Sequence, residues 1–415
     1  MEQHIPGIVL KDGLTQPVFD YKRCLFEKVY VETPVDTDGD GRLDLIAVYI
    51  RRPLETTQGM RVPAIYVANP YMLECNEDWY VPHDVDRDVS PYPQQHITES
   101  DITFDPSTVS FPQPRYPRAT IGYADTAPTE EIPLDCISDW YSYFNSRGYA
   151  SVFCGGLGTR GSQGFNCCGS PEETAAFKAV IDWLNGRCRA FTNLTDNIEI
   201  RADWCTGKVA MSGKSYLGTM CIAVASTGVE GLETIIPEAA ISNWYDYYRC
   251  NGLNLPAIGW QGDDLDILAK YCFSRAKDPE DYASVREAYA AWLEGIAADE
   301  DRDSGNYSRW WDMRNYLKAA DRFKASVFLV HGLADWNVKP THCVNLFAAM
   351  ESRGIPCKMM LHQGGHIYIH DLQGSRFNEM LHLWLDHWLY GIENGAAERI
   401  PNVLVQSNLD QDLWL

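Results

Sequence analysis

KVAMSGKSYLGTM, residues 208–220, has the pattern of a short strand, a sharp turn and the first turns of a helix. A serine on such a turn holds its hydroxyl above the edge of a sheet, and the next backbone N–H points at the same place. The strict Gly-x-Ser-x-Gly pattern is not met, because Leu217 stands where the second glycine belongs and Gly218 follows it. Ser215 is therefore a candidate nucleophile, and a glycine-serine turn without a catalytic role is the alternative.

On both sides of this turn, strand-like and helix-like segments alternate along the chain. The strand-like segments are short and apolar, and they comprise residues 45–51, 64–68, 149–154, 208–211, 326–332 and 358–363. Such alternation predicts a mainly parallel sheet with helices on both faces. Together with the serine turn, it predicts an α/β fold of the α/β-hydrolase type.

The best-marked helix is expected from Pro171 to Leu184. Ser170 can cap this helix, proline suits its first position, and Glu173 completes a capping box. Apolar residues then recur on one face, and Gly186 ends the helix.

Residues 245–318 interrupt the alternation, because their pattern is helical, acidic and aromatic. We expect them to form a helical cap inserted between two strands of the core. The α/β-hydrolase domain is then expected to comprise residues 16–244 and 319–398. Residues 72–135 are rich in Pro, Asp and Tyr and are expected to form a long irregular excursion.

An acid and a base for Ser215 can be sought by their order in the chain. An α/β hydrolase carries its triad in the order Ser, acid, His, with the acid and the base on loops after later strands. Asp335 follows the strand-like segment 326–332, and His366 follows the segment 358–363 and two glycines. These two residues are the predicted acid and base for cleavage of an amide or ester. Their rivals are Asp321, which precedes its strand, and His331, His362 and His370.

Several longer segments carry a resemblance to one family. The most characteristic are VAMSGKSYLGTM (209–220), IIPEAAISNWYDYYR (235–249), HGLADWNVKP (331–340) and LHQGGH (361–366). They resemble the Xaa-Pro dipeptidyl-peptidases, serine peptidases of a wider family that also holds cocaine-esterase-like enzymes and α-amino-acid ester hydrolases. The similarity runs from about Gln16 to Leu415. It implies release of N-terminal Xaa-Pro dipeptides through an acyl-enzyme on Ser215, with Asp335 and His366 as acid and base.

The same resemblance implies an oxyanion hole, the pair of donors that stabilises the negatively charged oxygen of an acyl-transfer intermediate. The family pairs the backbone N–H after the serine, here that of Tyr216, with a tyrosine hydroxyl from an Asn-Pro-Tyr-like turn. That tyrosine falls on Tyr71. A phenol can donate a charge-assisted hydrogen bond to an oxyanion. An ordinary turn tyrosine is the alternative for Tyr71.

Two features of substrate binding are also implied. Trp244 and Tyr247, with Asn337 beside the acid, would form an apolar pocket for proline, although aromatic rings near a cap are also common core residues. The family binds the free ammonium of the substrate with a glutamate in a Gly-Glu-Asp-like turn. Here Asp263 takes that position. Its side chain is one methylene shorter, so the salt bridge is expected to lengthen or the turn to shift.

The composition narrows the classes of partner. A formal charge of -22 argues against nucleic acid and mildly favours cationic ligands, such as the free α-amino end of a proline-containing peptide. No apolar run of membrane length and no secretory leader are visible in the sequence. Thirteen cysteines without a Cys-x-x-Cys pair predict a reduced, cytoplasmic protein. No metal or organic cofactor is called for, and a homodimer is left open.

Asp36-Thr37-Asp38-Gly39-Asp40-Gly41 imitates the start of a calcium loop. The twelfth position is Ala47 rather than the bidentate glutamate of an EF-hand, and residues 45–47 are strand-like. A tight hairpin turn without calcium is therefore the prediction.

The family resemblance also bears on the extent of the chain. Full-length members that resemble this chain carry an N-terminal helical region and a C-terminal β-sandwich, and residues 399–415 are expected to begin such a sandwich. The chain is expected to be a fragment, a minimal form or the product of a truncated gene. The predicted function is that of an Xaa-Pro dipeptidyl-peptidase. The alternatives are an α-amino-acid ester hydrolase or carboxylesterase of the same family, and a truncated, inactive relic.

Overall fold

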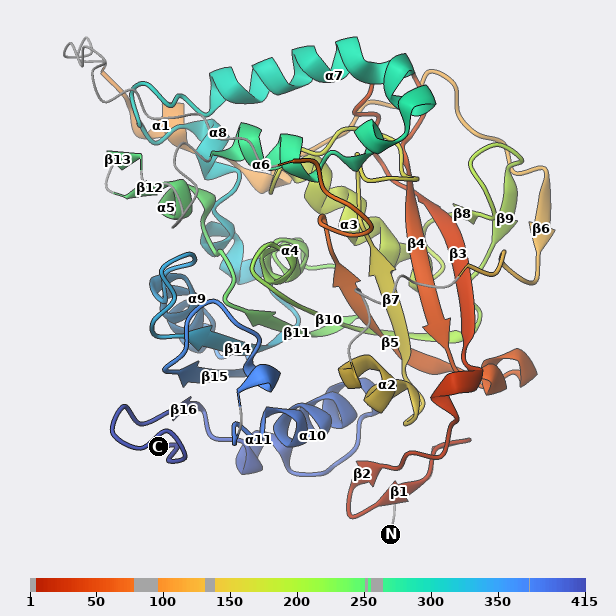
Figure 1. Cartoon of the computed structure of the whole chain (residues 1–415), viewed down its shortest axis with the longest axis vertical. Coiled ribbons are helices and arrows are strands. Elements are labelled where there is room, and N and C mark those ends of the chain that lie inside the picture. Colours follow the sequence, from red (N-terminus) through yellow and green to blue (C-terminus); the bar gives the residue numbers. More distant parts are fainter. Residues whose placement is uncertain (1–4, 78–95, 131–138, 251–252, 255–263, 373) are drawn as a thin grey trace.

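The computed structural model describes residues 5–77, 96–130, 139–250, 253–254, 264–372 and 374–415. A large twisted sheet runs through the molecule, with helices packed around it (Figure 1). Its parallel part, in spatial order, consists of β16 (Val403–Val405), β15 (Cys357–His362), β14 (Ser326–Gly332), β11 (Leu232–Glu238), β10 (Cys205–Lys214), β5 (Val62–Ala68) and β7 (Ala150–Cys154). This mainly parallel order confirms the predicted α/β-hydrolase fold.

Beyond β7 the sheet continues with mostly antiparallel pairs. These strands are β4 (Leu45–Arg52), β3 (Leu25–Glu32), β8 (Ala190–Phe191), β9 (Ile198–Ile200) and β6 (Gly122–Ala124). β3 and β4 pair from Glu32 opposite Leu45, so their connection is the whole of residues 33–44. The expected tight hairpin turn is therefore wrong, since this connection is a longer loop.

The strands of the parallel part divide their side chains between two hydrophobic cores. In β5, for example, Ala64 and Tyr66 face one core and Ile65 faces the other, as expected where side chains alternate along a strand. The first core packs against α3 (Pro171–Leu184), α4 (Tyr216–Ala225) and α9 (Thr341–Glu351). The second packs against α2 (Asp139–Asn145), α10 (Phe377–Tyr390) and α11 (Ala396–Arg399). The prediction of helices on both faces is thereby confirmed.

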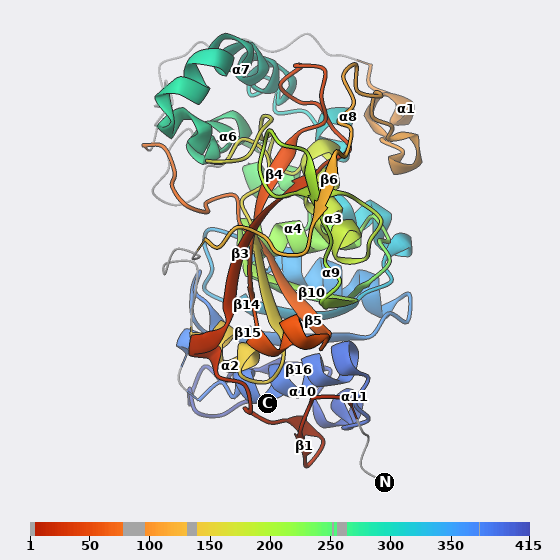
Figure 2. The ribbon, with the colours of Figure 1, turned by 90° about the vertical axis from the view of Figure 1, so that its right-hand side faces the viewer.

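The segment expected as a cap is mainly helical. It contains α5 (Trp244–Tyr248), the two-residue strands β12 (Arg249–Cys250) and β13 (Leu253–Asn254), α6 (Leu265–Cys272), η5 (Ser274–Lys277), α7 (Pro279–Asp299) and α8 (Arg309–Asp312). In Figure 2, α6 and α7 lie together at the opposite end of the molecule from α10 and α11. The division into a hydrolase domain and a cap stays a prediction.

Two predicted segments contain more regular structure than expected. Within the described part of residues 72–135, α1 (Glu99–Ile102) and β6 interrupt the irregular chain. In residues 399–415, β16 pairs in parallel with β15 and so extends the main sheet. The assignment of residues 399–415 to a following sandwich stays a prediction. Among the described residues, none of the helices combines the length and the apolar character that crossing a bilayer requires.

Candidate active site

The turn between β10 and α4 holds Ser215 in an unusual backbone conformation. Its φ is 62° and its ψ is -125°, a region that costs a residue with a Cβ about 1–3 kcal/mol. Neighbouring groups hold the turn in place, since the Ser215 N–H donates to the Glu238 carbonyl at 2.9 Å. The Ser215 carbonyl accepts from the Thr219 N–H and the Thr219 hydroxyl, both at 2.8 Å. This is the strained geometry expected of a nucleophile elbow.

The displaced second glycine of the elbow has a steric explanation. A Cβ on Gly218 would lie 2.6 Å from the Gly213 carbonyl oxygen, and one on Gly213 would lie 2.4 Å from the Leu217 Cβ. Position 213 therefore packs closely against both Leu217 and Gly218, and position 218 has no room for a side chain. The strained backbone of Ser215 is thus present although the second glycine is displaced by one position.

Asp335 and His366 meet at the ends of neighbouring strands. The His366 Nδ1 donates to Asp335 Oδ2 at 2.7 Å, and the side chain of Asp335 is fully buried. Asp335 Oδ1 accepts from the backbone N–H groups of Asn337 (2.9 Å) and Val338 (3.0 Å). The carboxylate is thus fixed on both oxygens, and it places the proton of a neutral imidazole on Nδ1. Nε2 is then left to act as the acceptor.

The rival histidines in this region have structural partners. His331 Nε2 bonds to the Val338 carbonyl at 2.7 Å, and His362 Nδ1 accepts from the Gly364 N–H at 3.1 Å. Burial lowers the pKa of His331 and lowers that of His362 to about 4. His370 lies within 3.6 Å of the Asp371 carboxylate. These contacts favour His366 as the base.

Ser215 and His366 line one cavity of about 440 Å³. Five other residues predicted from the sequence line the same cavity: Tyr71, Tyr216, Trp244, Tyr247 and Asn337. Asp335 is connected to the cavity by its hydrogen bond to His366, which lines it. Asp263, the predicted partner of the substrate ammonium, lies outside the described residues. Residues from distant parts of the chain therefore converge on the space beside the serine.

The aromatic residues of this cavity form a connected set. The ring of Tyr71 meets that of Tyr216 edge-on at 5.7 Å, and Tyr216 meets Trp244 at 5.2 Å. Trp244 is fully buried, and its Nε1 donates to the Tyr316 hydroxyl at 3.0 Å. The Tyr247 hydroxyl donates to Asn337 Oδ1 at 2.6 Å. Because Asn337 follows the acid loop, this bond joins the aromatic wall to the segment that carries Asp335.

A buried carboxyl group lies behind the elbow. The Tyr216 hydroxyl donates to Glu173 Oε1 at 2.7 Å, and Glu173 Oε2 accepts from the Gly169 N–H at 2.5 Å. Burial raises the pKa of Glu173. The predicted capping box is therefore half right. Ser170 Oγ accepts from the Glu173 N–H at 3.3 Å, but the carboxylate binds the residue before the cap and anchors Tyr216.

Sequence reasoning missed part of the cavity wall. Ile267, Leu268 and Tyr271 of α6 also line the cavity. Their spacing indicates one face of a helix but does not predict what that face contacts. Lys214 and Tyr368 line the cavity beside the base. The Lys214 ammonium lies 4.8 Å from the centre of the Tyr368 ring and donates to the His366 carbonyl at 3.3 Å. These contacts hold the loop that carries the base.

Glu238, at the end of β11, links the elbow to the same loop. Its backbone carbonyl accepts from the Ser215 N–H at 2.9 Å, and its Oε2 accepts from the Ile369 N–H at 2.8 Å. Burial of this side chain raises its pKa to about 8. Glu238 thus keeps its proton in the folded protein at pH values where it would lose that proton in the unfolded chain.

We expect Glu238→Gln to flatten the pH dependence of stability. As the pH rises from about 4.5 to about 8, the unfolded chain releases this proton while the folded protein retains it, so the wild type loses free energy of unfolding. The variant keeps an acceptor for the Ile369 N–H. Between about pH 5 and pH 8, the free energy of unfolding of the variant should rise relative to that of the wild type by on the order of 2 kcal/mol or more. Urea unfolding of both proteins across this range measures the difference.

The matched control for this experiment is Glu294→Gln, which removes an exposed carboxyl group from α7. It should leave the pH dependence of the wild type unchanged. Equal pH slopes for the wild type and Glu238→Gln would show that Glu238 is ionised in both states.

Comparisons with known proteins agree with this geometry. The profile of a family described as "X-Pro dipeptidyl-peptidase (S15 family)" matches residues 38–368. A relative named Xaa-Pro dipeptidyl-peptidase from Pediococcus pentosaceus is 44% identical over 405 residues, which are 97% of this chain and 49% of the relative. The relative of the same name from Lactiplantibacillus plantarum is 45% identical over 406 residues, with 97% and 49% covered. The chain thus spans about half the length of the curated relatives it matches.

Solved structures share the fold at lower identity. An α-amino acid ester hydrolase superposes with a TM-score of 0.52 at 18% identity, covering 100% of this chain and 61% of the other. An aminopeptidase from a marine sediment archaeon, Thaumarchaeota archaeon, gives a TM-score of 0.54 at 14% identity, with the same coverage. At these identities the likeness concerns the fold alone.

Proposed function

The chain belongs to the X-Pro dipeptidyl-peptidase (S15) family, and on that premise we propose that it releases Xaa-Pro dipeptides from the N-terminus of peptides. The observation that carries the proposal is the bond between His366 and Asp335 beside a cavity that Ser215 and an aromatic wall share. Ser215 is the nucleophile, His366 the base and then the acid, and Asp335 the residue that orients His366.

The reaction proceeds in two halves. His366 Nε2 takes the proton of the Ser215 hydroxyl, and the serine oxygen attacks the carbonyl carbon of the second substrate residue. When the tetrahedral intermediate collapses, His366 gives this proton to the departing amine, and the dipeptide remains as an ester on Ser215. Water, activated by the same imidazole, then hydrolyses the ester and frees the dipeptide.

The oxyanion of each intermediate is bound by two donors. One is the backbone N–H of Tyr216, a first-turn N–H of α4 that has no partner within its own helix. The other is the hydroxyl of Tyr71, which lines the same cavity. The side chain of Tyr216 is tied to Glu173, so this donor is held in place before the charge develops, as transition-state stabilisation requires.

The aromatic wall accounts for a preference for proline. Trp244 and Tyr247 line the cavity, and the apolar ring of proline fits an aromatic lining without leaving a polar group unpaired. The bond from Tyr247 to Asn337 fixes one edge of this wall relative to Asp335. The proline ring would therefore bind with its carbonyl close to Ser215.

Release of a dipeptide, rather than cleavage within a chain, requires an anion for the free α-ammonium group. In this proposal, the carboxylate of Asp263 is the anion that binds the α-ammonium group. We expect free Gly-Pro-p-nitroanilide to be cleaved at least about 100-fold faster than its N-acetylated form, because acetylation removes the charge that pairs with Asp263, a loss of a few kcal/mol. Comparing kcat/KM for the two substrates is the test of the function.

Each outcome of this comparison has a defined meaning. Equal kcat/KM values for the free and acetylated substrates would refute both the exopeptidase proposal and the proposed role of Asp263. Hydrolysis of simple esters without release of p-nitroaniline from either substrate would favour the ester hydrolase alternative. Asp263→Asn should lower kcat/KM for the free substrate and leave that for the acetylated one unchanged, whereas Asp299→Asn in α7 should change neither.

The remaining sequence predictions accompany this proposal. The hydrolase domain comprises residues 16–244 and 319–398, and residues 245–318 form its cap. A reducing, cytoplasmic compartment is supported by buried free thiols such as those of Cys154, Cys205 and Cys221. A homodimer stays a prediction from the sequence.

A further inference from the structure

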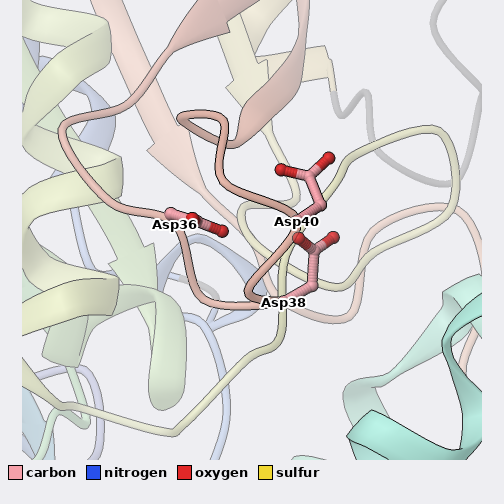
Figure 3. A group of neighbouring side chains, drawn as sticks. All are labelled: Asp36, Asp38 and Asp40. Atoms are coloured by element: carbon pink, nitrogen blue, oxygen red, sulfur yellow. The ribbon is translucent and has the colours of Figure 1, made fainter. Parts of the chain in front are cut away.

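The loop between β3 and β4 brings three carboxylates together far from the catalytic residues in the sequence. Ligand oxygens of Asp36, Asp38 and Asp40 all lie within 4.8 Å of one another. Figure 3 shows the three side chains projecting from this single loop. Two oxygens bound to one Ca²⁺ lie at most about 5 Å apart, which is twice the Ca–O distance. The three side chains are thus close enough to share one ion.

Two carboxylate oxygens of this group are buried without a hydrogen-bond donor. They are Oδ1 of Asp36 and Oδ1 of Asp38, and the side chain of Asp38 is only 7% exposed. The other oxygen of each group is occupied, since Asp36 Oδ2 accepts from the Gly41 N–H at 2.9 Å and Asp38 Oδ2 from Arg275 at 2.9 Å. A buried carboxylate oxygen without a partner is costly. A cation shared by both oxygens would remove that cost.

The order of ligands suits calcium even though the loop is not an EF-hand. Carboxylates at alternate positions followed by a glycine match the first three ligands and the invariant glycine of a calcium loop. Gly41 has a φ of 87°, and its N–H closes the loop onto Asp36. Ala47 lies in β4 and offers no ligand, as the sequence indicates, but Ca²⁺ also accepts backbone carbonyls and water.

A fourth carboxylate, that of Asp44, lies at the ninth position when a calcium loop is counted from Asp36. Asp44 is buried, and its Oδ2 accepts from the N–H and the hydroxyl of Thr37 at 2.8 and 2.7 Å. Through these two bonds Asp44 holds the start of the loop in shape. From this arrangement we propose that the loop of residues 33–44 binds one Ca²⁺ through the carboxylates of Asp36, Asp38 and Asp40.

The site would join the loop to the cap. Arg275, which binds Asp38, also binds Asp281 of α7 at 2.7 Å and the Gly164 carbonyl at 3.1 Å. The Gly164 N–H in turn donates to Asp38 at 3.3 Å. An ion that holds Asp38 would therefore stabilise the contact between the β3–β4 loop, the glycine-rich segment 155–164 and the cap. No residue that lines the catalytic cavity is among these ligands.

Calorimetric titration of the whole chain with CaCl2, after removal of divalent ions with EGTA, tests the proposal. We expect one Ca²⁺ per chain, with a Kd between about 10⁻⁶ and 10⁻³ M, and weaker binding of Mg²⁺, which demands a more regular octahedron of ligands. Saturating Ca²⁺ should also raise the melting temperature, because a ligand that binds only the folded state stabilises it.

The ligand variants are Asp36→Asn and Asp40→Asn, since Asp38 has a second role with Arg275. Each should weaken Ca²⁺ binding by at least about 10-fold and reduce the Ca²⁺-dependent rise in melting temperature. Glu294→Gln, which removes an equal charge from an exposed position on α7, should bind Ca²⁺ as the wild type does. The proposal is overturned if the wild type shows no binding up to about 10 mM Ca²⁺, or if both ligand variants bind with unchanged affinity.

Discussion

Ser215→Ala should lower kcat for Gly-Pro-p-nitroanilide by a factor on the order of 10⁴–10⁶. The variant keeps the cavity and the donors for the oxyanion but has no oxygen to attack the substrate carbonyl. KM should change little, because the substitution leaves the proposed proline pocket and the proposed ammonium site untouched. His366→Ala should cause a loss of the same order, and the double variant should be no worse than either single one, because the two groups act as a unit.

A fluorophosphonate probe separates loss of the nucleophile from loss of the fold. The wild type should be labelled on Ser215, and Ser215→Ala should not be labelled although its melting temperature stays close to that of the wild type. Ser352→Ala is the matched control, since this exposed hydroxyl just after α9 bonds to its neighbours in the chain, the Ala349 carbonyl and the Arg353 guanidinium. Full activity of Ser215→Ala, or equal labelling of both proteins, would refute the triad. Absence of labelling in the wild type would favour the inactive relic.

The predictable part of the site is the part encoded in short segments and their order. The turn 208–220 reveals Ser215 because a strand, a strained turn and a helix follow one another within a few residues. Asp335 and His366 could be found because parallel strands end at the same edge of a sheet, so residues that follow β14 and β15 must lie near each other. Their bond of 2.7 Å is the consequence of this topology.

Contacts between segments that lie far apart in the sequence could not be predicted from the order of short segments. The capping pattern at Ser170 predicts where Glu173 lies but not that its carboxylate anchors Tyr216, because that contact depends on how α3 packs against α4. The loop 33–44 illustrates the same limit. Counted from Asp36, the sequence departs from an EF-hand at the twelfth position, Ala47 of β4. The buried oxygens of Asp36 and Asp38 that lack a hydrogen-bond partner can be recognised only once the burial of the loop is known.

The second large effect is expected for Tyr71→Phe, which should lower kcat by about 10²–10³-fold. The variant removes one hydroxyl from the cavity and keeps the ring, so its edge-on contacts with Tyr216 and Tyr271 are preserved. A donor that meets the substrate oxygen mainly when it is negatively charged contributes to kcat and hardly to KM. The loss should therefore appear in kcat for both Gly-Pro-p-nitroanilide and simple esters, because each reaction passes through an oxyanion.

Tyr116→Phe is the matched control, since it removes the hydroxyl of a tyrosine that is 54% exposed and is not among the residues lining the cavity. It should leave kcat unchanged, whereas Tyr71→Phe should still react with the fluorophosphonate, only more slowly. A loss of less than about 5-fold in Tyr71→Phe would mean that the backbone N–H of Tyr216 acts with another donor. A polar group available for that role is Asn69, which lines the cavity and whose Oδ1 accepts from the Tyr71 N–H at 3.1 Å. Asn69→Ala should then show the loss of kcat expected here for Tyr71→Phe.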